Sequence, residues 1–275
     1  MSRPHRAQTS EGSARVLGTV ILACEMIEDE VRLALEAVPS ERRPAVVWVE
    51  SGLHDHPEKL QAALQHLVDL LDDGVRSGTA VTLPSVRPDR GPADARRVDV
   101  TVEPVSEVLL ALGFCGKGLQ GLVSEHVTMV FPRVDDCVSL FLNQGCTREE
   151  IPRDTRSYYL TGGWFRHNSS LNEAFEDWVE RYGPERAASL RKAMFRGYER
   201  VSLIDTKAYE VDDFVEQSHD YADDLELEHV IVQGSVQLLE RLFRKDWNSE
   251  IVVVPPGEAI GFSHLFTADA CMPPG

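Results

Sequence analysis

Apolar-rich runs of strand length alternate with stretches of helical hydrophobic spacing along most of the chain. The runs lie at 16–24, 45–50, 107–114, 127–132, 157–163, 200–205, 228–234 and 250–256. Between them, stretches such as 56–74 carry apolar residues at helical spacing. This alternation predicts an α/β fold with a mostly parallel sheet and helices on both faces, a doubly wound, Rossmann-like arrangement. The alternation is also compatible with two similar halves.

Segments without this pattern mark the predicted limits of the domain. Residues 1–14 are polar and predict a disordered tail, 15–255 then form a single α/β domain, and 256–275 form a C-terminal tail. Residues 77–98 contain three prolines and four arginines. They predict an inserted loop with little structure of its own. Gly183 and Pro184 predict a break within the helical stretch that precedes the strand at 200–205.

The net charge, the apolar runs and the cysteine count of the chain indicate which kinds of partner it binds. The formal net charge of -17 argues against a nucleic-acid or anionic-membrane surface, since both require a positive footprint. No run of 18 apolar residues and no apolar leader is present, so we expect a cytoplasmic protein that neither spans nor binds a membrane. The five cysteines are expected to be reduced there, and some of them are candidates for metal ligands or nucleophiles. A small molecule is the expected partner.

Three of the cysteines follow predicted strands. Cys24 ends the first strand, Cys115 follows the third and Cys137 follows the fourth, while His54 lies shortly after the second. Ligands of open parallel sheets bind at the carboxyl ends of the strands. Three thiolates and an imidazole suit zinc, and the thiolates also suit an iron–sulfur cluster with one open iron. The alternative is that each cysteine is a small buried hydrophobic residue, the role that we assign to the remaining two, Cys146 and Cys271.

A glycine pattern surrounds one of these thiols. Gly116, Gly118 and Gly121 spell G-x-G-x-x-G directly after Cys115. Only about ten residues separate Gly116 from the next predicted strand, which is too few for the long helix of a dinucleotide site. The turn is therefore expected to carry Cys115 to the sheet edge, or to offer backbone N–H groups at Gly116 and Gly118 to a small anion or cofactor.

Four side chains near the strand ends are candidates for supporting roles. His54 is a fourth ligand or a general base, unless its segment only starts a helix. Asp136 is a base or orients a ligand. Lys117 would lower the pKa of a neighbouring thiol, unless it is an exposed loop residue. Trp164 forms a wall of the binding pocket or packs in the core.

The segments "ILAC", "LHDHPEKL", "GFCGKGLQGL", "FPRVDDCVSL" and "YYLTGGW" occur in this order within residues 17–255. The series resembles a family of uncharacterised bacterial and archaeal proteins that carries a domain-of-unknown-function label. The Cys, Leu-His, Cys-Gly and Asp-Cys pattern of that family corresponds here to Cys24, His54, Cys115, Asp136 and Cys137. Two features depart from the family pattern: the insertion at 77–98 is longer, and Gly162 stands where a proline is expected. Some members lie near corrinoid-dependent methyl-transfer genes, so the resemblance implies a corrinoid-protein partner.

These features together predict a cytosolic metal-dependent enzyme, a transferase or lyase that acts on a small molecule. The resemblance adds a link to methyl-group or one-carbon metabolism. An open position on the metal would polarise a substrate oxygen or activate a thiol. Two alternatives stay open: a non-catalytic module that binds or delivers a metal or cofactor, and a metal-free thiol enzyme with Cys115 as nucleophile, activated by Lys117. Each of these functions is compatible with a homo-oligomer.

Overall fold

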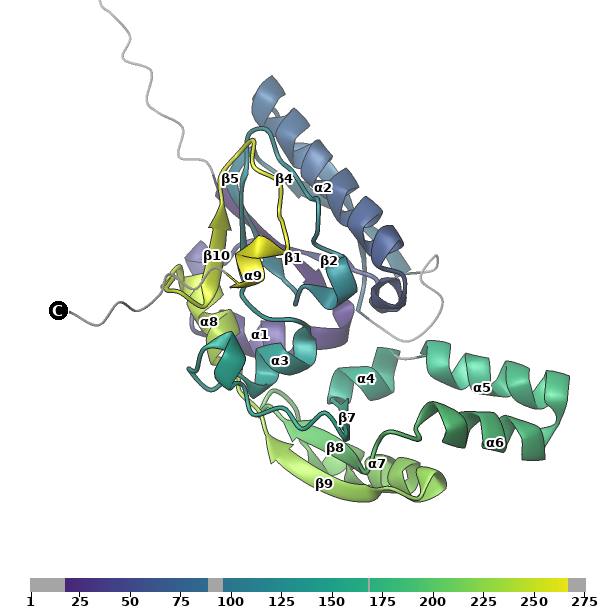
Figure 1. The fold of residues 1–275 in the computed structure, drawn as a ribbon. Helices are drawn as coiled ribbons and strands as arrows, with labels where there is room; N and C mark the ends of the chain where they lie inside the picture. The colour runs from purple at the N-terminus through teal and green to yellow at the C-terminus, as the bar shows by residue number, and fades with distance from the viewer. Residues whose placement is uncertain (1–17, 89–95, 168, 267–275) are drawn as a thin grey trace, which may run out of the picture.

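Among the residues that the structure describes, the strands form three separate sheets (Figure 1). The computed structural model describes residues 18–88, 96–167 and 169–266, so the predicted tail at 1–14 lies outside the described residues. The strands are β1 (Gly18–Cys24), β2 (Ala45–Val49), β3 (Val81–Val86), β4 (Arg97–Val102), β5 (Val105–Ala111), β6 (Thr128–Pro132), β7 (Ser157–Leu160), β8 (Arg200–Asp205), β9 (Glu228–Gln233) and β10 (Ile251–Val254).

Helices connect most of these strands. They are α1 (Glu28–Glu36), α2 (Pro57–Ser77), α3 (Cys137–Leu142), α4 (Gly162–His167), α5 (Ser169–Tyr182), α6 (Pro184–Met194), α7 (Asp212–Leu225), α8 (Gln237–Arg244) and α9 (Ser263–Phe266). Short 3-10 turns follow three strands: η1 (Glu25–Ile27), η3 (Ser51–Asp55) and η5 (Cys115–Lys117). The predicted break is confirmed, because α5 ends at Tyr182 and α6 begins at Pro184. Among the described residues, no helix combines the length and the apolar content needed to cross a bilayer.

The largest sheet has five strands in the order β10-β6-β5-β1-β2. The pairs β1–β2, β1–β5 and β5–β6 are parallel, and β10 pairs antiparallel with β6. Val20, Ile21 and Leu22 of β1 are fully buried, as expected for a strand covered on both faces. Helices α1 and α8 pack against each other, α8 contacts β5 and β6, and α2 contacts β5 and β3. The expected mixed α/β fold with a mostly parallel sheet is therefore present.

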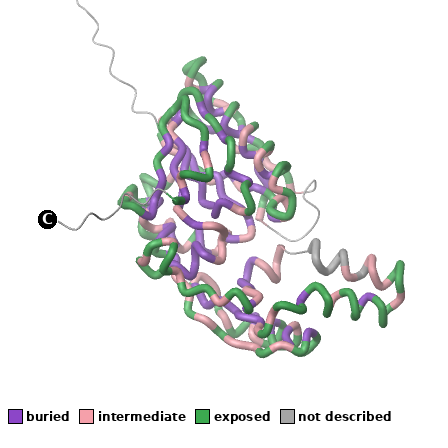
Figure 2. Tube along the Cα trace, viewed as in Figure 1, coloured by how far each residue is buried: buried purple, intermediate pink, exposed green. Residues whose placement is uncertain are grey.

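A second parallel sheet, β7-β8-β9, corrects the expectation of one continuous sheet. Its strands have a small core of their own, which includes Leu160, Val201, Leu203, Phe214 and Leu225. Figure 1 shows it below the five-stranded sheet, with the α5–α6 hairpin extending beside it. Figure 2 shows most buried residues in the upper body. Strand–helix alternation is a local signal and does not determine which strands share hydrogen bonds, which explains the error.

Two segments expected to be irregular are structured. Within 77–98, β3 is paired antiparallel with β4, and it alternates between buried residues such as Leu83 and exposed ones. Ser85 accepts a hydrogen bond from the backbone N–H of Trp48 (2.8 Å), which ties the hairpin to β2. The loop prediction is wrong there because Pro84 and the arginines obscure a period-two pattern; residues 89–95 lie outside the described part.

The C-terminal segment 256–266 is also part of the fold rather than a tail. Ile260 and Leu265 are each 1% exposed and belong to the main core. The backbone N–H of Gly121 donates to the carbonyl of Ile260 (2.7 Å), and the N–H of Ile260 donates to the carbonyl of Leu122 (2.8 Å). Two buried apolar side chains and a short backbone pairing thus attach this segment to the main core. Residues 267–275 lie outside the described residues.

Close contacts join the two parallel sheets at the ends of their strands. A Cβ atom at Gly163 of α4 would lie 1.8 Å from the carbonyl oxygen of Met26 in η1, so the two segments touch backbone to backbone. Arg166 forms an ion pair with Asp29. These contacts bring the segment after β7 against the segment after β1.

Candidate functional site

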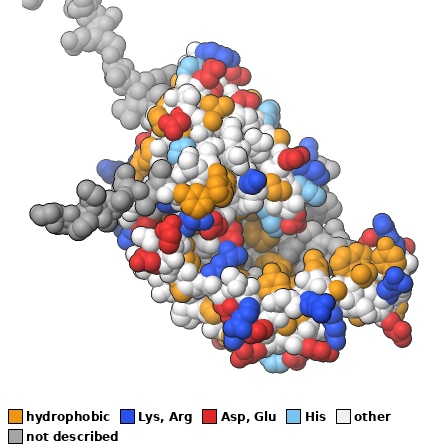
Figure 3. Space-filling view, in the orientation of Figure 1, with side chains coloured by type: hydrophobic (Ala, Val, Ile, Leu, Met, Phe, Trp, Pro, Cys, Tyr) orange, Lys and Arg blue, Asp and Glu red, His pale blue; other side chains and the backbone are white. Residues whose placement is uncertain are grey.

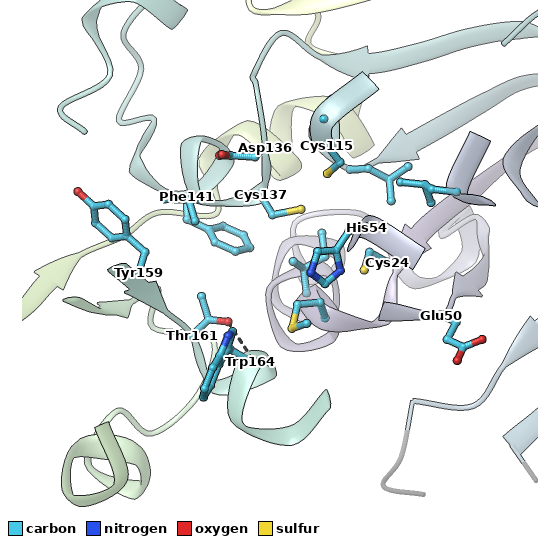
Figure 4. Close-up of a pocket in the computed structure, with 16 residues that line it drawn as sticks. Cys24, Glu50, His54, Cys115, Asp136, Cys137, Phe141, Tyr159, Thr161 and Trp164 are labelled. Carbon is cyan, nitrogen blue, oxygen red and sulfur yellow. Dashed lines mark hydrogen bonds between the residues drawn. The ribbon is translucent and has the colours of Figure 1, made fainter. Parts of the chain in front are cut away.

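A cavity of about 300 Å³ lies where the strand ends of the two parallel sheets meet. Its walls come from the segments after β1, β2, β5 and β6 on one side and from β7 and α4 on the other. Figure 3 shows a hollow with hydrophobic side chains between the upper body and the β7–β9 part. Polar and reactive groups are concentrated on the side of the five-stranded sheet (Figure 4).

All three strand-end cysteines line this cavity. Cys24 is the last residue of β1, Cys115 opens η5 after β5, and Cys137 opens α3 after β6. The three strands are neighbours in the order β6-β5-β1, so their carboxyl ends meet at one edge. Figure 4 shows the three sulfur atoms turned toward the same space. Cys146 is a free thiol that does not line the cavity, and Cys271 lies outside the described residues.

Backbone packing holds two of the thiols side by side. A Cβ atom at Gly113 would lie 2.3 Å from the Cα of Asp136, so only glycine allows the two loops this close. The backbone N–H of Cys115 donates to the carbonyl of Asp135 (2.8 Å). The loop after β5 therefore rests directly on the loop after β6.

Asp136 positions Cys137 through the start of α3. Its Oδ1 accepts a hydrogen bond from the backbone N–H of Ser139 (2.8 Å), which is an N-cap contact. Its Oδ2 accepts from Nη1 of Arg153 (2.5 Å). Both carboxylate oxygens are thus engaged. These contacts fix the carboxylate at the start of α3.

The three thiols differ in acidity because they interact. Cys137 has a lowered pKa, mainly because the Cys115 thiol donates a hydrogen bond to it, with a backbone hydrogen bond from Gly113 adding to the effect against burial. The same thiol–thiol bond, together with burial, raises the pKa of Cys115 well above its usual range. Burial and the neighbouring charge of Cys137 raise the pKa of Cys24. These directions make Cys137 the most acidic of the three thiols.

The glycines at 116, 118 and 121 allow a tight turn after β5. Cys115, Gly116 and Lys117 have φ values of 44°, 61° and 88°, three successive residues in the left-handed region. The non-glycine members cost about 1 kcal/mol or more each, a strain that often accompanies functional sites. A Cβ at Gly118 would lie 2.5 Å from Leu60, and the N–H of Gly121 is bonded within the fold. Gly116 lines the cavity, but Gly118 does not, so packing accounts for Gly118 without a cofactor.

Lys117 does not line the cavity that holds the thiols. Its side chain is exposed, and it lines a separate surface groove beside the start of α2. The pKa of Cys115 is raised, whereas activation by Lys117 required it to be lowered. Cys115 lines the cavity and Lys117 lines the separate groove, so this geometry gives no support to activation of Cys115 by Lys117.

His54 lines the cavity from the side of η3. Its Nδ1 is hydrogen-bonded to the backbone carbonyl of Ser51, and its Nε2 lies 3.4 Å from Oδ1 of Asp55. A proton on Nδ1 for that bond leaves the lone pair on Nε2, the tautomer of many metal-binding histidines, and Nε2 must leave Asp55 to bind a metal.

Aromatic side chains form much of the remaining wall. Tyr159 and Trp164 line the cavity from the opposite side, and Phe141 of α3 lines it next to Cys137. The Trp164 ring packs edge-on against Tyr221, with 5.2 Å between the ring centroids. Trp164 therefore combines the two roles that the sequence left open, since it faces the cavity and also packs in the core of the second sheet.

Two buried carboxylates behind the cavity were not anticipated from the sequence. Glu25 is fully buried and accepts hydrogen bonds from Arg96 Nη1 (2.5 Å) and from the backbone N–H of Ser51 (3.0 Å). Glu30 is fully buried, and its Oε1 accepts from Thr206 of the segment after β8 (3.0 Å). Burial raises the pKa of Glu30 to about 7, and its Oε2 has no hydrogen-bond partner among the described residues. In the sequence, these two carboxylates are marked only by the run of acidic residues at the start of the first helix.

Among the described residues, no group of three or more His, Cys, Asp or Glu side chains is arranged as it stands to hold a metal ion. The interaction of the Cys115 and Cys137 thiols raises the pKa of Cys115 and lowers that of Cys137. Coordination of a metal would remove the remaining thiol protons. Three thiols around one cavity are nevertheless the donor set that soft ions prefer.

Comparisons with known proteins give one finding. A family model described as "Protein of unknown function (DUF1638)" matches residues 93–243, more than half of the chain. This span contains Cys115 and Cys137, whereas Cys24 and His54 precede it. No curated protein and no solved structure matches the chain.

Proposed function

The chain belongs to the DUF1638 family of proteins of unknown function, and we propose that it is a metal-dependent enzyme acting on a small molecule. Cys24, Cys115 and Cys137 hold zinc or an iron–sulfur cluster, and the cavity admits the substrate to the remaining open position. The observation that carries the proposal is that thiols from three adjacent strands line one cavity and shift one another's pKa.

Charge explains why such a cavity suits a cation. Three thiolates in an enclosed space of low dielectric repel one another, so without a metal Cys24 and Cys115 retain their protons. A soft cation displaces these protons and replaces the repulsion with attraction. When bound, it supplies Lewis acidity toward a substrate oxygen or thiol. The protein orients Cys137 through the Asp136 cap and excludes water with the aromatic wall.

His54 is the proposed fourth ligand or general base. Its hydrogen bond to the Ser51 carbonyl supports the tautomer with a free Nε2. The corrinoid-protein partner, the homo-oligomer, the doubly wound arrangement with two similar halves and the cytoplasmic location stay predictions.

The test is metal retention by anaerobically purified protein. We expect about one zinc ion or one cluster per chain, identified by elemental analysis and absorption spectrum. Cys24→Ser, Cys115→Ser and Cys137→Ser should each lower retention at least tenfold. Cys146→Ser is the matched control, since that thiol lies away from the cavity, and it should retain the metal. Full retention in Cys115→Ser, or failure of the protein to bind any soft ion on reconstitution, would overturn the proposal.

The lowered pKa of Cys137 favours a second candidate, a metal-free thiol enzyme with Cys137 as nucleophile. It differs from the first candidate in requiring no metal for any reaction. Binding of zinc or cobalt(II) by all three thiols with micromolar affinity or better would speak against it.

A further inference from the structure

The cavity lacks positive charge. Among the described residues that line it, none is a lysine or an arginine, while Glu50 and Asp136 carry carboxylates. Its remaining walls are largely apolar, with Met26, Leu112 and Val138 among them.

Basic side chains on the flanking segments are paired with carboxylates or turned away. Arg153 is bonded to Asp136 (2.5 Å), and Arg148 is bonded to Asp135 (2.6 Å). Lys117 lines the separate groove beside α2. An anion entering the cavity would therefore meet thiolates and apolar walls, with no cation from these segments to compensate its charge.

We infer that the ligand of this cavity is a small molecule with an apolar group and no negative charge beyond the atom that binds the metal, and that a further anionic group is disfavoured. The inference rests on the proposed function and names the substrate class of the same site. Three thiolates around a divalent ion carry one net negative charge, which disfavours a further anion. The apolar wall favours burial of an apolar group, and the faces of Phe141 and Trp164 favour a cation. A volume of about 300 Å³ lies at the lower end for small-molecule sites.

The experiment is a charge series of thiol probes on cobalt(II)-substituted protein. The visible absorption of cobalt(II) reports the ligand at the open position. The probes are 1-propanethiol, 2-aminoethanethiol and mercaptoacetate, which are similar in size and differ in charge, compared at equal thiolate concentration. We expect mercaptoacetate to bind at least tenfold more weakly than 1-propanethiol, and 2-aminoethanethiol to bind at least as tightly. Equal or tighter binding of mercaptoacetate would overturn the inference.

A positive charge in the wall should weaken the preference against mercaptoacetate. Val138→Lys adds a cation to the lining and should shift the ratio of the mercaptoacetate and propanethiol affinities at least tenfold toward the anion. Val253→Lys, at an exposed position on β10, is the control and should leave the ratio unchanged. If Val138→Lys does not fold, Glu50→Gln removes one negative charge and should shift the ratio severalfold in the same direction. An unchanged ratio in a folded variant would count against the inference.

Different results would overturn the proposed metal-dependent function and the inferred charge of the ligand. Absence of any cobalt–thiolate absorption would overturn the proposed function, and the inference would fall with it. A normal cobalt–thiolate spectrum combined with equal affinity for all three probes would overturn the inference alone.

Discussion

At the scale of single residues, the three thiols of the cavity have unequal tasks. The pKa of Cys137 is lowered by the Cys115 thiol, whereas the pKa values of Cys24 and Cys115 are raised, mainly by burial and by Cys137. The most acidic thiol thus belongs to the residue that Asp136 fixes at the start of α3. Reactivity of the metal-free protein should therefore be concentrated at one sulfur.

The first prediction concerns the source of this acidity. Cys115→Ala removes the donated hydrogen bond, so the pKa of Cys137 should rise and its alkylation by iodoacetamide near pH 7 should slow severalfold. Labelling is measured peptide by peptide by mass spectrometry in metal-free protein between pH 6 and 10. Cys146→Ala is the control and should leave the profile of Cys137 unchanged. An unshifted profile in Cys115→Ala would show that the thiol–thiol bond does not set the acidity.

Glu30 carries a second residue-scale prediction. Its folded pKa of about 7 exceeds the usual 4.5, so its contribution to stability is fully present below pH 4.5 and is lost as pH rises through 7. Above pH 7 the ionised, half-satisfied carboxylate costs roughly 3 kcal/mol, an upper bound at about 1.4 kcal/mol per pH unit. Glu30→Gln should therefore be stabilised relative to the wild type at pH 8 and much less at pH 5. Urea denaturation at both pH values measures this, and an equal effect at both would contradict it.

At the scale of elements, close approaches between turns shape the site more than any single helix does. Gly113 lets the loops after β5 and β6 touch, and Gly163 lets α4 rest on η1. Both glycines have no room for a side chain, and both stand beside segments that line the cavity. The cavity therefore depends on two backbone contacts.

Gly163→Ala tests the second contact. The new Cβ would lie 1.8 Å from the Met26 carbonyl oxygen, so α4 must move and the fold should lose about 3 kcal/mol. Gly197→Ala is the matched control, because no atom lies within 4 Å of the position that its new Cβ would take, and its effect should stay within about 1 kcal/mol. Chemical denaturation compares the two, and equal stability would mean that α4 can move away from η1 at little cost.

Some of these elements could be predicted from the sequence and others could not. The positions of Cys24, Cys115 and Cys137 followed from strand ends, because parallel strands end at a common edge. The β3–β4 hairpin did not follow, since Pro84 and the arginines weaken its alternation. The inward turn of Cys115 and the outward turn of Lys117 depend on three left-handed residues, a backbone path that spacing does not reveal.

At the scale of the whole molecule, the cavity lies between the two parallel sheets, and both sheets contribute residues to its walls. The segments after β1, β5 and β6 contribute the thiols, and the segments around β7 and α4 contribute the aromatic wall. A soft divalent ion would replace the repulsion among three thiolates with attraction to one cation and would leave a single net negative charge between these parts. Binding should therefore be visible both as released protons and as added stability.

The last prediction measures both effects in one titration. Adding zinc to metal-free protein near pH 7 should release roughly two to three protons per ion, because Cys24 and Cys115 begin protonated and coordinated thiols are deprotonated. At a free zinc concentration 100 times Kd, the folded state should gain about 2.7 kcal/mol. A pH indicator in weak buffer counts the protons, and thermal unfolding with and without a chelator gives the stability. Cys24→Ser should release about one proton fewer, whereas Cys146→Ser should match the wild type. Zinc binding without proton release would mean that the ion sits elsewhere, since these two thiols cannot coordinate it and keep their protons.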